Sequence, residues 1–181
     1  MLRGPRTDRL CRASLARRGA CGSAAKPPRD SGQRTILSGA ALKTLGEVVE
    51  SRADDFFAVF GEPRSAIDTA IAIQRELRER SWVDDLEVLV RVGIHCGYPT
   101  VNEGNYIGMA VHTTARICAA AHGGQVLISG DTRQATKGSP ADGLRFRSLG
   151  EYRLRGLPEA VPLFQVDAKG LRSRFPPLRA S

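Results

Sequence analysis

The stretch that decides the fold runs from Tyr106 to Ser129 and reads YIGMAVHTTARICAAAHGGQVLIS. Apolar residues recur at spacings of three and four over its first part, which predicts a helix of about four turns. Gly123-Gly124 is expected to end this helix, and the apolar run at 125–129 predicts a buried strand. The predicted inward face of the helix comprises Ile107, Val111, Ala115 and Cys118.

His112 and Arg116 lie four residues apart on another face of this helix, so their side chains should point the same way. An arginine held there could neutralise charge that develops on a phosphoryl group in a transition state. Asp54 and Asp55 are expected in a tight turn between two strands, where they could hold a hard divalent cation. Both pairs are equally compatible with an ordinary polar surface, so the residues alone leave these alternatives open.

Charge is distributed unevenly along the 181 residues, whose formal net charge is +8. Residues 1–34 contain nine Arg or Lys against Asp8 and Asp30, a net +7, whereas the remaining residues are close to neutral at +1. The composition predicts a disordered basic segment at 1–34, with a transit-peptide-like start or a non-native start as alternatives. A folded domain is expected at 35–168, followed by a linker-like tail at 169–181.

Several classes of function are disfavoured. The chain has no P-loop, no Rossmann fingerprint and no His or Cys spacing typical of zinc. No uncharged apolar run approaches a membrane span. Cys96 and Cys118 are expected to be buried free thiols in a cytoplasmic protein, and His95 is expected to be a core or rim histidine.

The order of the predicted elements indicates an α+β or α/β sandwich with mixed strand pairing. The predicted hairpin at 144–154 pivots on Gly150, and the end of a helix is expected at 36–45. The other predicted helices are 65–80 and 131–134, and the other predicted strands are 47–52, 56–60, 86–94 and 161–166.

Five ordered motifs resemble those of class III adenylate/guanylate cyclase domains. The string DDFFAVF at 54–60 is similar to the family's GDGFFAVF hairpin, and VGIHCG at 92–97 to its RIGIHTG strand. YIGMAVHTTAR at 106–116 resembles the YVGxxVNxAAR helix, and GGQVLIS at 123–129 resembles GGQVLLS. The segment from Gly150 to Phe164 resembles the family's closing GxxxLKGL…LF pattern.

This resemblance implies a ferredoxin-like cyclase sandwich with a mixed, mainly antiparallel sheet. It also implies a bacterial signalling enzyme that converts ATP, possibly GTP, into a cyclic nucleotide and pyrophosphate, using two Mg²⁺ or Mn²⁺ ions. Such domains pair head to tail, which implies a homodimer or a heterodimer with an intact cyclase domain. Neither a membrane nor a nucleic acid is an expected partner.

Site residues follow from the resemblance position by position. Asp54 matches the second metal-binding aspartate, and Arg116 matches the arginine that stabilises the transition state. His112 stands where the family has the asparagine that orients the ribose. Asn105 occupies the position that selects the base, and Glu50 occupies that of a base-contacting lysine.

The family's opening strand, FxDIxG[ST]T, has no counterpart before Ile36. This predicts a truncated or mis-started domain whose first strand and first metal-binding aspartate are missing, and hence impaired activity. Three functions remain open: a working cyclase, a non-catalytic cyclase-like partner module, and nucleic-acid binding through the basic segment.

Overall fold

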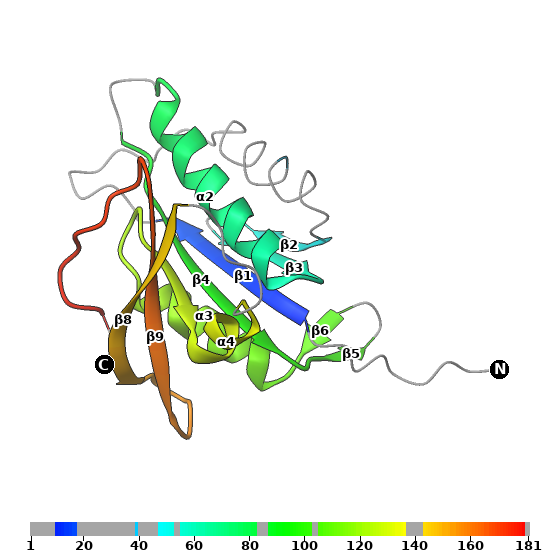
Figure 1. Ribbon diagram of the computed structural model, residues 1–181. Helices are drawn as coiled ribbons and strands as arrows, with labels where there is room; N and C mark the ends of the chain where they lie inside the picture. Colours follow the sequence, from blue (N-terminus) through cyan, green and yellow to red (C-terminus); the bar gives the residue numbers. More distant parts are fainter. Residues whose placement is uncertain are drawn as a thin grey trace, which may run out of the picture.

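The computed structural model describes residues 10–17, 39, 47–52, 55–82, 87–102, 105–136 and 143–179. Seven strands form one mixed, mainly antiparallel sheet in the order β2-β3-β1-β4-β7-β9-β8, and a two-stranded ribbon pairs β5 with β6 (Figure 1). The predicted α+β class is therefore confirmed. The strands of the sheet are β1 (Leu10–Arg17), β2 (Glu47–Arg52), β3 (Asp55–Phe60), β4 (Val90–Gly97), β7 (Val126–Ser129), β8 (Leu144–Arg153) and β9 (Ala160–Ala168).

The strand β1 lies in the middle of the sheet, antiparallel to both β3 and β4. The prediction that a first strand is missing is therefore wrong, and so is the prediction of disorder for Leu10–Arg17. The composition LCRASLAR gives a weak strand signal. Two flanking strands nevertheless offer it hydrogen-bonding edges on both sides, and filling that gap pairs backbone groups that would otherwise be left without partners.

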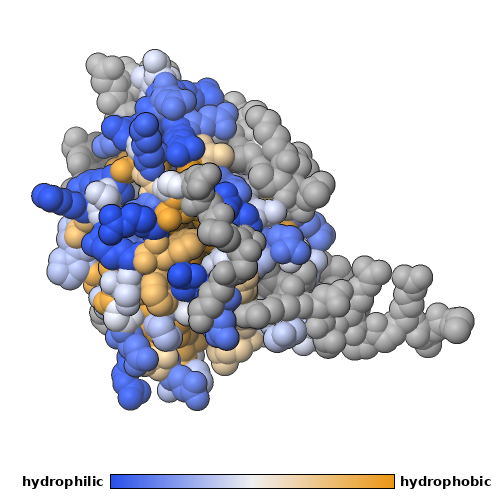
Figure 2. Space-filling model, in the orientation of Figure 1, coloured by the Kyte–Doolittle hydropathy of each residue, from blue (hydrophilic) through white to orange (hydrophobic). Residues whose placement is uncertain are grey.

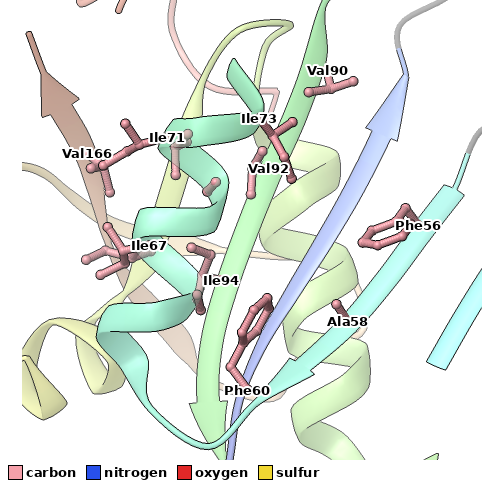
Figure 3. Packing of buried hydrophobic residues seen from close by; sticks show 14 of the residues in the cluster. Phe56, Ala58, Phe60, Ile67, Ile71, Ile73, Val90, Val92, Ile94 and Val166 are labelled. Carbon is pink, nitrogen blue, oxygen red and sulfur yellow. The ribbon is translucent and has the colours of Figure 1, made fainter. Parts of the chain in front are cut away.

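Side chains alternate between the two faces of β4, and this alternation assigns the helices to opposite faces. Val92 and Ile94 point toward α2 (Pro63–Glu79), which packs across the sheet as Figure 3 shows. Gly93 lies between them in the strand and faces α3 (Met109–Ala120) instead. The α2 face holds the larger cluster, which includes Phe56, Phe60, Ile67, Ile71, Ile73, Val90 and Val166.

Several predicted elements need correction. The segment predicted as a hairpin around Gly150 is the single strand β8, because β9 pairs with it on both sides of Gly150; Gly150 itself adopts φ 99° at an irregularity in the register. The prediction for β4 began four residues early, since residues 87–89 are not in a strand. The two-stranded ribbon consists of β5 (Thr100–Asn102) and β6 (Asn105–Ile107). The helix predicted at 36–45 lies outside the described residues except for Gly39, which is helical.

The cysteine predictions have mixed outcomes. Cys118 is a buried free thiol, as expected. Cys96 is disulfide-bonded, so the prediction of a free thiol there is wrong. The residue directly across from it in the β1–β4 ladder is Cys11. Placing Cys11 opposite Cys96 required the register of β1, which the sequence pattern did not provide.

The segment after β9 packs against the domain. The backbone N–H of Arg179 donates to the carbonyl of Ala120 at the end of α3, and the His122 ring lies parallel to that of Phe175, with 6.5 Å between centroids. Leu178 adds to the apolar cluster on the α3 face. The segment predicted as a linker-like tail thus contributes contacts to the fold, while the proposed boundaries at 34/35 and 168/169 stay predictions. Among the described residues, no helix combines the length and the apolar character needed to cross a membrane.

Candidate functional site

The helix α3 lies directly on β4 because Gly93 has no side chain. A Cβ atom at Gly93 would lie 2.3 Å from the backbone nitrogen of Cys118 and 2.9 Å from the carbonyl oxygen of Thr114. The backbones of helix and strand therefore touch at this point, which fixes the height of α3 above the sheet. At Gly97, a Cβ atom would lie 2.9 Å from the Cβ of Ala110 in the first turn of the helix.

The buried face of α3 differs from the predicted one. Ile107 is 48% exposed and Ala115 is exposed, whereas Cys118 is buried. The close approach to Gly93 selects small residues, so the row that faces the sheet is Ala110, Thr114 and Cys118. The Thr114 hydroxyl can be buried because it donates to the carbonyl of Ala110 at 2.8 Å.

His112 and Arg116 are both exposed on the outer side of α3, as their spacing predicts. Within the described part of the chain, neither side chain forms a hydrogen bond or ion pair. One terminal nitrogen of Arg116 lies 4.0 Å from the place a Cβ would take on Gly156, in the turn between β8 and β9. The guanidinium therefore keeps its N–H donors available for an anion brought by a substrate or a second chain.

The acidic half of the predicted site lies largely outside the described residues. Asp54 is not among them, and only the backbone of Asp55 is described, as the first residue of β3. Asp55 pairs with Ala16 of β1. The central strand is thus present beside the hairpin, but its sequence, LCRASLAR, contains no Asp or Glu.

The described residues do not supply the ligands for a metal site built on two carboxylates. Among the described residues, no group of three or more His, Cys, Asp or Glu side chains could hold a metal ion. The strand that would supply the first carboxylate has neutral or basic residues at every position. Asp54 as a metal ligand and Mg²⁺ or Mn²⁺ as cofactor stay predictions from the resemblance, and this chain's described residues do not complete that site.

Two other predicted residues have clear positions. Asn105 begins β6 and pairs with Asn102 of β5, so its backbone is placed, whereas its side chain is not described. His95 Nδ1 lies 2.9 Å from the hydroxyl of Ser129, the residue that caps the short helix α4 (Gly130–Ala135). This contact confirms His95 as a structural histidine at the edge of the core.

The sequence reasoning missed an apolar surface around the start of α3. Tyr98, Ile107 and Met109 are 67%, 48% and 56% exposed, respectively. The signal that could have revealed it was the sequence YIGMAV, which contains more apolar residues than one buried helix face can accommodate. We refer to these three residues as the α3 apolar surface; exposed apolar surface of this kind favours contact with another protein.

Comparison with known proteins identifies the architecture. An uncharacterized protein of Mycobacterium tuberculosis (strain H37Rv) is 33% identical over 129 residues, which cover 71% of this chain and 42% of that protein. The structure of adenylate cyclases from Trypanosoma brucei in their monomeric state superposes with a TM-score of 0.85 and 20% identity, covering 96% of this chain and 93% of that one. The fold is that of the class III adenylate/guanylate cyclase domain.

A relative with a stated activity supports the same resemblance. The pH-sensitive adenylate cyclase of Mycobacterium tuberculosis (strain CDC 1551 / Oshkosh) is 29% identical over 133 residues, which cover 73% of this chain and 31% of that enzyme. The chain therefore spans less than half the length of these curated relatives. No family model matches the chain.

Proposed function

We propose that this chain is a cyclase-homology domain that contributes Arg116 and His112 to an active site completed by a second cyclase domain. One contrast supports the proposal most directly. Arg116 is exposed, with no partner among the described residues, whereas the strand β1 beside the hairpin contains no carboxylate residue. We therefore propose that this chain supplies the basic part of the site and that a second domain completes the set of carboxylates.

The chemistry explains why an isolated arginine is useful. In the reaction implied by the resemblance, the ribose 3′-oxygen of ATP forms a bond to the α-phosphorus. The bond from that phosphorus to the pyrophosphate group breaks, and the 3′-hydroxyl loses its proton. Negative charge grows on the phosphoryl oxygens, and a guanidinium placed against them stabilises the transition state.

His112 would orient the ribose. Its imidazole N–H can donate a hydrogen bond to a ribose oxygen, as the amide of an asparagine would. The divalent cations of the reaction would be held by the carboxylates of the second domain. We propose ATP as the substrate, on the analogy of the pH-sensitive adenylate cyclase. GTP stays the alternative, because Asn105 at the base-selecting position does not decide between the two bases.

The α3 apolar surface supports a paired arrangement. It adjoins the first turn of the helix that carries His112 and Arg116, and burying it would bring these two side chains into an interface. We propose a head-to-tail pair with an intact cyclase domain, because a second copy of this chain would lack the same carboxylate on β1. A cytoplasmic location, where ATP is present, is part of the same proposal.

A complementation experiment tests this function. The cyclase domain of the pH-sensitive adenylate cyclase is prepared with the residue aligned with Arg116 replaced by alanine, and it is assayed with ATP and Mn²⁺ in the presence of this chain. We expect this chain to raise cyclic AMP production by about 100-fold, the usual effect of one transition-state donor. Arg116→Ala should abolish the gain, whereas Arg145→Ala, which removes an equal charge from an exposed position on β8, should not.

Two results would contradict the proposal. No rescue by a folded chain would exclude Arg116 as a donor to a partner site. Cyclic AMP formation by this chain alone would show that it supplies its own carboxylates and needs no second kind of domain.

A further inference from the structure

A cavity of about 780 Å³ lies at the end of α2, and neither His112 nor Arg116 lines it. Its walls come from four parts of the chain: the end of α2 with the residues that follow it, the approach to β4, Gly124 in the turn between α3 and β7, and the tail at 171–174. Buried side chains of Gln74, Leu77 and Val88 form its inner wall. The volume lies within the range usual for sites that bind small molecules.

The rim of this cavity is strongly basic. Four arginines line it, against the single acidic residue Glu87 among the described lining residues. Arg78 and Arg80 come from the end of α2, and Arg172 and Arg174 come from the tail. Figure 2 shows hydrophilic residues gathered over this upper end of α2. Four guanidinium groups around one concavity produce a positive potential that attracts anions.

Three of the four arginines have contacts that hold them in place and leave most of their donors available. Arg80 stacks on the Trp82 ring at 4.9 Å, and Arg172 stacks on the Phe175 ring at 5.2 Å. The Arg78 Nη1 group donates to the Gly170 carbonyl. Stacking leaves the N–H edges of a guanidinium unused, and those edges match phosphate oxygens in a bidentate way.

Trp82 gives the cavity a rigid aromatic wall. Its indole N–H donates to the Leu77 carbonyl at 2.9 Å, which fixes the ring against the end of α2. An apolar inner wall, one aromatic ring and a basic rim suit a ligand with an apolar or aromatic body and a charged phosphate end.

We propose that this cavity binds a small organic phosphate carrying at least two phosphate groups, of the nucleoside diphosphate class. The site is separate from the proposed function at Arg116 and does not depend on it. Bound phosphate would bridge α2 and the tail, because arginines from both segments reach the same cavity.

Trp82 is the single tryptophan of the chain, so its fluorescence reports directly on this cavity. The intact protein is titrated with adenosine 5′-diphosphate, inorganic pyrophosphate and adenosine. We expect saturable changes with the diphosphate and with pyrophosphate, tighter binding of the former, and no change with adenosine. Binding should weaken as salt is raised.

Matched variants assign the response. Arg174→Glu should weaken binding at least about 30-fold, because it reverses one of the phosphate-facing charges. Arg155→Glu makes the same charge change in the exposed turn at the opposite end of the β8–β9 pair, and it should leave binding within about twofold. The response should persist in Arg116→Ala, so failure here is distinguishable from failure of the proposed function.

Three outcomes would overturn the site. The first is no response to either phosphate in a folded protein, and the second is an equal loss of binding in both glutamate variants. The third is a response to an acidic peptide but to neither phosphate, which would assign the surface to a protein partner instead.

Discussion

Substituting Gly93 by alanine should push α3 away from the sheet and lower the stability of the protein by a measurable amount. The added Cβ would lie 2.3 Å from the Cys118 nitrogen and 2.9 Å from the Thr114 oxygen. Both are backbone atoms of the helix, so no side-chain rotation relieves the overlap. Since ordinary Cβ contacts begin near 3.4 Å, the helix must retreat by about 1 Å, which loosens a close-packed interface.

Gly93→Ala should lower the unfolding free energy by about 3 kcal/mol, the upper part of the range for overpacking. Urea denaturation followed by circular dichroism measures it, and the melting temperature should fall by about 6–12 °C for a domain of this size. The control is Gly61→Ala, an exposed glycine with nothing within 4 Å of the added Cβ, which should stay within about 0.5 kcal/mol of the unchanged protein.

Gly93→Ala should also lower the complementation attributed to Arg116 by about 100-fold, because a displacement of this size misplaces the guanidinium. Equal stability of the two alanine variants would refute the contact between α3 and β4.

Two further predictions concern stability. We expect Cys11 to be the disulfide partner of Cys96, because it lies directly across the β1–β4 ladder. Peptide mapping without reductant should find this pair, and any other pairing would contradict the register. Reduction should lower the unfolding free energy by about 4 kcal/mol, because the disulfide closes a loop of about 85 residues. Gln165→Leu should lower the unfolding free energy measured by urea denaturation by about 1–3 kcal/mol. The reason is that the buried side-chain N–H of Gln125, which donates to Gln165 at 2.9 Å, would lose its acceptor. Gln134→Leu, at an exposed position on α4, is the matched control, and an equal loss of stability in the two variants would exclude the buried hydrogen bond as the cause.

Elements with strong local periodicity could be predicted from the sequence. The predicted strand Glu47–Arg52 is β2 with the same bounds, and α2 and β7 lie within two residues of their predicted limits. Their patterns are local: β-type residues in the strands and a 3.6-residue period in the helix. These signals do not depend on knowing which elements become neighbours.

The wrong predictions concern elements whose structure depends on the elements packed beside them. The strand β1 forms because β3 and β4 leave a gap between them, which LCRASLAR does not reveal. The orientation of α3 is set by Gly93, on another element. Gly150 marks an irregularity within β8 instead of a turn, because β9 continues alongside it. For the site, the spacing of His112 and Arg116 predicted that they share one face of the helix, since a helix fixes that relation locally, and both are exposed.

The position of Arg116 depends on contacts at both sides of α3. On the sheet side, Gly93 sets the distance between helix and strand. Beyond the end of the helix, the carbonyl of Ala120 accepts from Arg179, and the ring of His122 lies 2.9 Å from the carbonyl oxygen of Pro177. A guanidinium that acts on a transition state must be positioned before the substrate arrives, because ordering it during the reaction would consume part of its stabilising effect. The tail therefore belongs to the framework that positions Arg116, and a ligand that fastens the tail to α2 would act on the same helix from its far end.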